Sequence, residues 1–290
     1  MFGPPLTKDA SNWWGTLFLT CAALIAFAGN SILSRLVLGH GWLDAATFSS
    51  LRLTFGAGTL ALLLMLNGET HPLKGGNWRG ATVLVVYAIA FSLSYLSLTT
   101  ATGALILFGV TQVTMLLLAL NAGNRPHILQ WLGLGLALGG LIYLLLPGVE
   151  APPMAGAALM GVAGIAWGSY TYLGHKSTAP LAQTAGNFLR AAPLAVIINV
   201  GLASQFHAEL VGILLAAVVG ALTSGLGYVA WYAALRNLAP IQAAVVQLCV
   251  PIIAAIGGFF LVSEPLSLRL ILSALIILGG IALALLGREY

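Results

Sequence analysis

Long apolar segments follow one another along almost the whole chain, and short stretches with glycine, proline and charged residues separate them. About 20 consecutive apolar residues cross the hydrocarbon core of a bilayer as one helix. The pattern therefore predicts an all-α integral membrane protein with almost no extramembrane domain. Ten transmembrane helices are expected, over residues 13–35, 45–67, 79–98, 101–121, 127–147, 152–173, 181–203, 211–234, 239–262 and 267–287.

The chain also repeats itself at an offset of about 140 residues. Two related stretches, from Ser94 to Ala104 and from Ala234 to Ala244, lead at the same spacing to the pairs Gly139-Gly140 and Gly279-Gly280. An odd number of spans per repeat makes the second copy enter the membrane from the opposite side, as in alternating-access transporters. The spacing predicts two inverted five-helix repeats in one integrated membrane domain, residues 1–150 and residues 151–290.

The composition supports a membrane protein and argues against several other classes. Hydrophobic residues make up 60% of the 290 residues, charged residues make up 6%, and the mean hydropathy is +1.01. Soluble domains carry about 25% charged residues. The formal net charge of +4 comes from scattered residues without a basic cluster, so we expect no nucleic-acid partner. The expected partners are the lipid bilayer and a small-molecule substrate.

Basic residues are distributed unevenly between the two sides of the predicted bundle. One side holds Arg35 and Arg269. The side with both termini holds seven, namely Lys8, Lys74, Arg79, Arg125, Lys176, Arg236 and Arg288. Cytoplasmic loops are enriched in Lys and Arg. The asymmetry predicts a multi-pass protein of the cell inner membrane with both termini in the cytoplasm.

Polar and aromatic side chains recur at helical spacing within several predicted spans, where hydrocarbon offers them no hydrogen-bonding partner. Such stripes turn toward protein or toward a water-filled pathway. Aromatic walls with a few neutral polar groups suit a small amphipathic solute. The candidate substrate-binding residues are Phe27, Asn30, Tyr87, Phe91, Tyr95, Thr111, Gln112, Trp167, Tyr170, Ser224, Tyr228 and Gln247.

Some of these residues have simpler explanations. Small and hydroxyl residues are common contacts between membrane helices. Tyr95 lies near the end of its span, as does Trp231 in the predicted span 211–234, and aromatic side chains form interfacial belts at such positions. Gln112 and Gln247 are more informative, because an amide in hydrocarbon needs hydrogen-bonding partners. We therefore favour an inward-facing role for both glutamines.

Two charged residues are predicted within spans, Arg52 and Arg190, at related positions of the two repeats. They could clamp a carboxylate or a phosphate. Arginines in membranes more often extend to the surface or bond helix-end carbonyls, and we favour that structural role. No acidic residue is predicted deep in a span, which argues against a carboxylate-based proton antiport and against a cation site.

The sequence contains no enzyme motif, whether HExxH, GxSxG or a phosphate loop. The five histidines fall in loops or at span ends and lack the spacing of metal ligands. We therefore expect no catalysis, no metal and no cofactor.

Several features of the second half resemble the repeat motifs of a known family. They are Trp167, Arg190, the stretch from Ala234 to Ala244, Pro251, the segment from Val262 to Leu266, and Gly279-Gly280. With ten short-looped spans in two halves, nearly the whole chain resembles the drug/metabolite transporter superfamily, in particular its EamA-like ten-helix branch. The first half departs from the pattern, because Thr111 replaces the proline and Asn124 replaces the glutamate.

The resemblance implies export of small metabolites through a central cavity, with the fifth and tenth spans at the periphery. Substrates in this branch include amino acids, notably aromatic and hydrophobic ones, and the wider superfamily moves drugs and nucleotide sugars. Together with the neutral aromatic stripes, it predicts an exporter of amino acids or similar zwitterionic metabolites that works by alternating access. A monomer suffices, because one chain holds both repeats.

Three other classes remain as alternatives. A multidrug exporter of lipophilic cations is the runner-up, and the missing membrane carboxylate counts against it. A passive channel for small solutes would lack saturable flux and counterflow. An intramembrane enzyme ranks lowest, because no nucleophile or metal ligands are evident.

Single cysteines in two loops test the predicted orientation. A cysteine at Gly75 should react only with thiol reagents that cross the membrane, whereas a cysteine at Gly148 should react with reagents added outside, because the charge asymmetry places Gly75 in the cytoplasm. The measurement is labelling in intact cells. The reverse labelling pattern would contradict this orientation.

Overall fold

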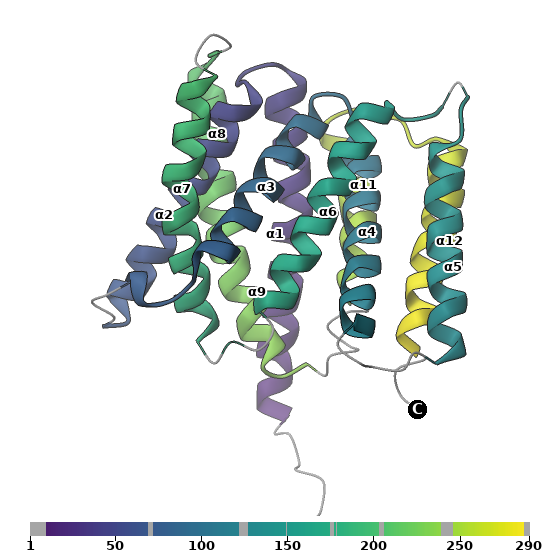
Figure 1. Ribbon diagram of the computed structural model, residues 1–290, viewed down its shortest axis with the longest axis horizontal. Helices are drawn as coiled ribbons and strands as arrows, with labels where there is room; N and C mark the ends of the chain where they lie inside the picture. The colour runs from purple at the N-terminus through teal and green to yellow at the C-terminus, as the bar shows by residue number, and fades with distance from the viewer. Residues whose placement is uncertain are drawn as a thin grey trace, which may run out of the picture.

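The computed structural model describes residues 10–68, 72–121, 127–148, 150–174, 177, 179–202, 206–238 and 246–286. Within these ranges the regular elements are all helical, apart from one isolated bridge between Leu43 and Ala208. The helices in chain order (Figure 1) are α1 (Ala10–Gly39), α2 (Ala45–Leu66), η1 (Pro72–Lys74), α3 (Trp78–Tyr95), α4 (Thr100–Asn121), α5 (Ile128–Leu145), α6 (Met154–Gly174), α7 (Pro180–Gly201), α8 (Leu210–Val218), η3 (Val219–Leu226), α9 (Gly227–Leu235), α11 (Cys249–Leu261) and α12 (Leu268–Leu286).

Eight described helical segments are long and apolar enough, by length and composition, to cross a membrane. One of them joins α8, η3 and α9 into a single segment, Leu210–Leu235. Two more predicted spans correspond to α6, whose glycines and polar C-terminal turn lower its hydropathy, and to the shorter apolar helix α11. The start of that last span, residues 239–245, lies outside the described residues. The chain is therefore an all-helical, multi-pass membrane protein.

Polar residues fix where several helices begin. The Asp44 carboxylate accepts hydrogen bonds from the backbone nitrogens of Ala46 (3.0 Å) and Thr47 (2.9 Å) at the start of α2. The Asn77 side chain accepts one from the Gly80 nitrogen (2.8 Å) at the start of α3. These caps satisfy amide groups that have no partner within the first helical turn.

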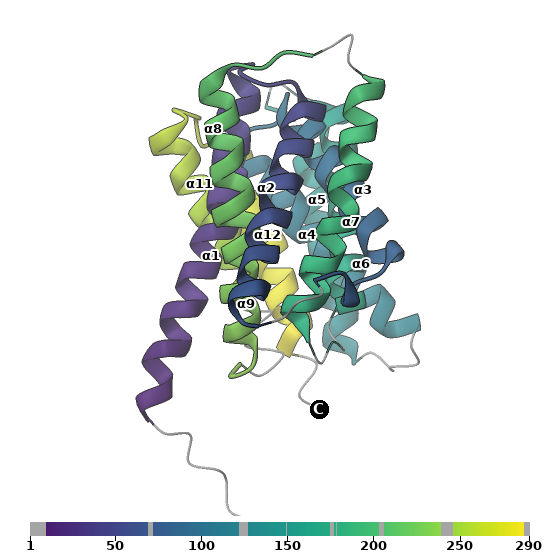
Figure 2. The same ribbon diagram turned by 90° about the vertical axis from the view of Figure 1, so that its left-hand side faces the viewer.

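Helices from the two halves of the chain pack against each other. α2 packs on α7, α6 packs on α3 and α4, and α1 packs on α9 and α11. α5 and α12 form a pair at one side of the bundle, at the right of Figure 1. Figure 2 shows the first turns of α1 projecting beyond the neighbouring helices. α1 begins at the same end of the bundle at which α12 ends.

Glycines bring the backbones of α5 and α12 into direct contact. A Cβ atom on Gly133 would meet the backbone of Gly280, and a Cβ atom on Gly280 would lie 2.6 Å from the Ala137 nitrogen. Gly135 and Gly139, which also have the GxxxG spacing, face open space. The face of α5 that contains Gly133 therefore contacts α12. The GxxxG spacing of Gly135 and Gly139 does not identify this contact face.

Arg190 fastens α7 to the loop before α3. Its Nη1 donates to the carbonyls of Gly75 (2.8 Å) and Gly186 (2.8 Å), and its Nη2 donates to that of Leu73 (2.9 Å). This is the structural role expected from the sequence. The contact also presses Gly75 against the backbone of Ala182, so a side chain at Gly75 has no room.

The labelling experiment therefore needs other positions in the same loops. Gly75 is packed against backbone, and Gly148 has a φ of +155° and lies where a Cβ atom would be 2.9 Å from Arg269. Both glycines are unsuitable for substitution. Lys74 and Glu150 are exposed neighbours that keep the comparison.

An ion pair joins the two halves at the end of the bundle opposite the start of α1. Arg35 Nε lies 3.0 Å from Glu264 Oε1. Arg35 Nη1 also donates to the Tyr95 carbonyl (2.9 Å), and Glu264 Oε2 accepts from the Thr100 nitrogen (2.7 Å). The sequence pattern ended the first span at Arg35 and so left it among the loop charges, but α1 continues to Gly39 and keeps Arg35 within the bundle.

Adjacent glycines of α12 provide a matched test of the packing. Gly280→Ala should lower the free energy of unfolding by about 1–3 kcal/mol, because the new methyl group meets the α5 backbone. Gly279→Ala should be neutral or stabilising, because its Cβ has open space and alanine favours helix. The measurement is thermal unfolding in detergent. Equal effects of the two substitutions would contradict this packing.

Candidate substrate cavity

A narrow cavity lies between helices of both halves of the chain. Its volume is about 20 Å³, which is room for about one water molecule. α1, α2, α3, α4, α6, η3 and α9 each contribute to its wall. The lining residues are Phe27, Asn30, Ser31, Arg52, Tyr87, Leu107, Phe108, Trp167, Thr223, Ser224 and Tyr228.

Aromatic rings close one side of the cavity. Phe27 lies edge-on to Trp167, Tyr228 and Trp231, with ring centroids 6.4, 6.0 and 5.9 Å apart. Trp167 also contacts Tyr228 (5.3 Å) and Tyr87 (5.1 Å). Such contacts stabilise one another through ring electrostatics as well as buried area. Trp167 is thus in contact with α1, α3 and α9 at once.

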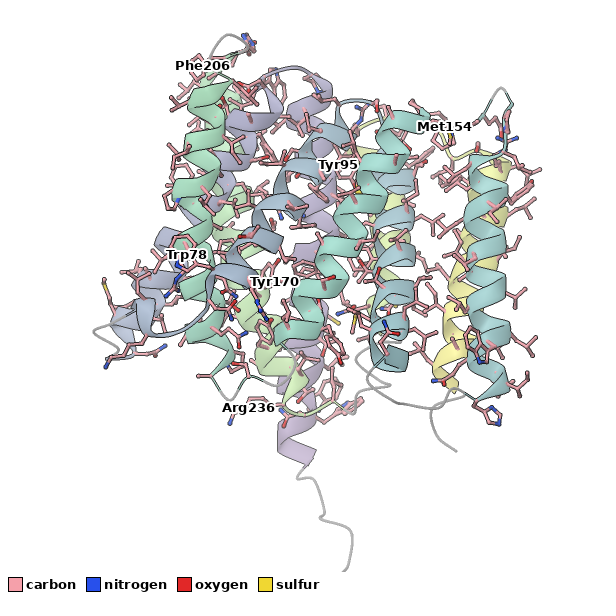
Figure 3. The ribbon with its side chains drawn as sticks, viewed as in Figure 1. Trp78, Tyr95, Met154, Tyr170, Phe206 and Arg236 are labelled. Carbon is pink, nitrogen blue, oxygen red and sulfur yellow. The ribbon has the colours of Figure 1, made fainter. Side chains whose placement is uncertain are left out.

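The same rings form part of a longer row along α3 and α6. Tyr95 contacts Phe91 (4.8 Å), Phe91 contacts Tyr87 (5.4 Å), and Trp167 stacks on Tyr170 (5.7 Å). Tyr95 and Tyr170, labelled in Figure 3, lie toward opposite ends of this row. Tyr95 is fully buried, so it is not part of an interfacial belt. Burial of Trp231 excludes a belt position for that residue too.

A π-helical segment, η3, forms the part of the wall that packs against α2. It occupies Val219–Leu226 in the middle of the long helix that α8 begins and α9 completes. A π-helix is wider than an α-helix and shifts the register of the following side chains. Thr223 and Ser224 both line the cavity from this segment. Gly220 permits the close approach of α2, because a Cβ there would lie 2.5 Å from the Arg52 carbonyl.

Arg52 lies inside the cavity wall and is only 2% exposed. Its Nε donates to the Ser224 hydroxyl (3.1 Å) and its Nη2 donates to the Tyr87 hydroxyl (3.2 Å). The guanidinium carbon lies 5.1 Å from the ring centroid of Tyr87 and 5.0 Å from that of Phe91. Contrary to the expectation from the sequence, Arg52 therefore neither extends to the surface nor bonds helix-end carbonyls. Neighbouring hydroxyl groups and aromatic faces hold its charge in the interior.

Three polar atoms of the cavity lining have no hydrogen-bonding partner among the described residues. They are Arg52 Nη1, Asn30 Oδ1 and Ser31 Oγ. The other amide atom, Asn30 Nδ2, donates to the Tyr87 hydroxyl (3.5 Å). Buried polar atoms are nearly always paired in native proteins. A free donor and a free acceptor beside the same hydroxyl therefore suggest a site for a polar ligand.

The remaining expected residues lie outside the cavity lining. Thr111 is buried and its hydroxyl donates to the Gly164 carbonyl (3.2 Å), so it bridges α4 and α6. Gln112 is partly exposed, and Gln247 is buried before α11. Neither glutamine contributes to the cavity, although their amide groups were the sequence argument for an inward-facing role.

Five lining residues were not among the expected ones. They are Ser31, Arg52, Leu107, Phe108 and Thr223. Leu107 and Phe108 are ordinary apolar residues of a membrane helix and carry no sequence signal. Thr223 depends on the π-helical register. Arg52 carried the clearest signal, an unbalanced charge within a span.

No carboxylate lines the cavity, and the described residues contain no cluster of metal-ligating side chains. Among these residues, ion pairs occur between Arg35 and Glu264 and between His207 and Glu209. The cavity is therefore apolar and aromatic, with Arg52 as its charged residue.

The chain is similar to several known proteins. Residues 154–286 match the EamA-like transporter family. A Pseudomonas aeruginosa protein described as uncharacterized is 50% identical over 273 residues, which cover 94% of this chain and 95% of that protein. An Archaeoglobus fulgidus protein described as an uncharacterized transporter is 27% identical over 286 residues, which cover 92% of this chain and 96% of that protein. A solved crystal structure has a TM-score of 0.67 at 16% identity over 95% of this chain and 99% of its own, and thus shares the fold.

The chain is a multi-pass helical bundle with an aromatic cavity between its halves, and it is related to a protein described as a transporter. It is therefore a membrane transporter. The match to the EamA-like transporter family covers the second half of the chain. This match and the relative described as a transporter point to transport rather than to catalysis.

Substitutions in the cavity wall test its role. Trp167→Ala and Tyr87→Ala should each lower transport about tenfold or more while the protein stays folded, because each ring is a central contact of the wall. Gln112→Ala should have little effect, because Gln112 lies outside the lining. The measurement is the initial rate of uptake into proteoliposomes, with elution profiles as the control for folding. Unchanged rates in both aromatic variants would contradict this assignment.

Proposed function

We propose that the chain exports amino acids, notably aromatic and aliphatic ones, or similar zwitterionic metabolites, by alternating access. The observation that supports this most directly is the cavity between the two halves, which combines aromatic walls with free hydrogen-bonding atoms. An apolar wall suits the side chain of such a substrate, and a few polar groups suit its charged end.

The proposal includes ten spans arranged as two inverted five-helix repeats, residues 1–150 and 151–290. Support comes from the packing pairs. In the proposed arrangement α1 corresponds to α6, α3 to α9, and α4 to α11. The pair α3 and α6 then has its counterpart in α9 and α1, and the pair α4 and α6 has its counterpart in α11 and α1. All four pairs are in contact. The pairs α2 with α7 and α5 with α12 map onto themselves, and they too are in contact. A two-fold relation between repeats produces such a pattern.

The orientation proposed is that of an inner-membrane protein with cytoplasmic termini. Arg236, labelled in Figure 3, lies at the end of the bundle where α1 begins. Lys74 and Arg79 flank the α2–α3 connection, which belongs to the same end. Basic residues near helix ends favour the cytoplasmic side.

Alternating access also agrees with the size of the cavity. About 20 Å³ is too small for an amino acid, so the helices must separate at one end to admit a substrate. The Arg35–Glu264 ion pair holds α1 to the segment after α11 at the end opposite the start of α1. Pro193 within α7 interrupts the helical hydrogen bonds and provides a place to bend. Pro251 lies in the first turn of α11, where a proline removes no hydrogen bond of the helix, so the kink expected there from the sequence is not found within α11.

The alternative substrates fit the cavity less well. A lipophilic cation would have to approach the buried guanidinium of Arg52 without a neighbouring carboxylate in the lining, and like charges in a low-dielectric interior repel strongly. This argues against a multidrug exporter of cations. A passive channel differs from a carrier in that its flux does not saturate and shows no counterflow.

Counterflow in proteoliposomes tests the proposal. Vesicles loaded with unlabelled phenylalanine or leucine should accumulate the labelled amino acid transiently and saturably, because a carrier must return its site across the membrane. Repeating the assay with an imposed pH gradient measures proton coupling. Empty liposomes are the control. Flux that does not saturate and shows no counterflow would indicate a channel, and the absence of amino-acid exchange in folded protein would overturn the proposed substrate.

A further inference from the structure

One nitrogen of the Arg52 guanidinium group has no hydrogen-bonding partner among the described residues. Nε and Nη2 bond to the hydroxyls of Ser224 and Tyr87, whereas the buried Nη1 has no partner among the described residues. Both assigned partners are neutral. The positive charge is therefore hydrogen-bonded but not neutralised.

Three other arginines among the described residues are partly buried and show how this chain satisfies such a charge elsewhere. Arg35 pairs with Glu264, and Arg269 donates to the Leu146 carbonyl. Arg190 sits at the repeat-related position and donates to three backbone carbonyls. Arg52 has neither kind of partner, and no described carboxylate forms an ion pair with it. An unpaired charge in a protein interior is strongly destabilising, so an anionic ligand would relieve a cost that the apo structure carries.

Two more atoms of the same cavity, Asn30 Oδ1 and Ser31 Oγ, have no partner among the described residues. Asn30 Nδ2 and Arg52 Nη2 both donate to the Tyr87 hydroxyl. The unpaired amide oxygen of Asn30 is therefore an acceptor on a side chain that shares a hydrogen-bonding partner with Arg52. The Tyr87 hydroxyl accepts both bonds, so its own hydrogen is left to donate.

We propose that Arg52 Nη1 binds the carboxylate of the transported substrate and that Asn30 Oδ1 accepts a hydrogen bond from its ammonium group. This inference rests on the proposed function and adds the chemical group that the site recognises. The two charged groups of an α-amino acid are attached to one carbon atom, so they require a donor and an acceptor that are close together. Arg52 and Asn30 meet this requirement through their common partner Tyr87.

The walls favour an organic anion over an inorganic one. Phe27, Trp167 and Tyr228 line the same cavity as Arg52 and offer apolar surface for a side chain. A small, strongly hydrated anion gains nothing from such surface. The site therefore selects a carboxylate that carries an aromatic or aliphatic group.

Thermal unfolding of the purified protein with a series of ligands tests the inference, because a ligand that binds the folded state raises the unfolding temperature. The reference ligand is phenylalanine. Phenylalaninamide and 2-phenylethylamine lack its carboxylate, and 3-phenylpropionate lacks its ammonium group. Sodium phosphate is the inorganic anion. Loss of a hydrogen bond to a charged group weakens binding roughly 10- to 100-fold. Phenylalanine should thus bind at least about tenfold more tightly than its amide, and 3-phenylpropionate should bind more tightly than 2-phenylethylamine.

Variants locate the effect. Arg52→Gln should remove the preference for phenylalanine over its amide, whereas Arg79→Gln, the same change at an exposed arginine, should keep it. Asn30→Ala should weaken binding of phenylalanine but not of 3-phenylpropionate. If Arg52→Gln fails to fold, the ligand series on the unaltered protein still decides.

Several results would overturn the inference. They are equal binding of phenylalanine and its amide, full affinity in Arg52→Gln, stabilisation by phosphate equal to that by phenylalanine, or stabilisation by none of the probes. The counterflow assay distinguishes failure of the Arg52 inference from failure of the proposed function. If amino-acid exchange does not depend on Arg52, the proposed function stands and the inference is wrong. Arg52-dependent binding of 3-phenylpropionate without amino-acid exchange would support carboxylate recognition and remove the amino-acid substrate.

Discussion

Hydrocarbon offers no hydrogen bond to any polar group, and most features of this chain follow from that constraint. It makes every spanning segment a helix, because only a helix satisfies the backbone within one segment. It also turns polar side chains toward protein, so the interior of the bundle collects them. Asn30, Arg52 and Ser224 lie on three different helices and meet in one cavity for this reason.

Two arginines at related positions of the halves show how the same residue acquires different tasks. Arg190 lies near the end of the bundle and bonds the carbonyls of a loop. Arg52 lies at the cavity, where a π-helical segment supplies Ser224 and α3 supplies Tyr87. A leucine precedes each arginine, but the surrounding helices differ. The surroundings therefore decide whether an arginine fastens a loop or lines the cavity.

In addition to the packing of helices along their length, specific side chains connect the halves at three levels of the bundle. The Arg35–Glu264 pair joins them at one end, the rings around Trp167 join them at the cavity, and the Arg190 contacts join α7 to the α2–α3 connection at the other end. α5 and α12, joined through Gly133 and Gly280, stand beside this arrangement.

The sequence by itself determined the class of fold, the approximate helix boundaries and the aromatic character of the interior, because hydrophobicity and helical periodicity are local properties. It identified Phe27, Tyr87, Trp167 and Tyr228 as inward-facing, since such rings recur on one face of each span. It did not predict that Arg52 lines the cavity, and it predicted an inward-facing role for Gln247, which lies outside the lining. The sequence of one helix does not show which residues of other helices contact its polar side chains. Arg35 and Glu264 are 229 positions apart, and Thr223 lines the cavity from a π-helical segment that packs against α2 at Gly220. Only the packing of the helices decided these pairings, because they depend on distances between segments that are remote in the chain.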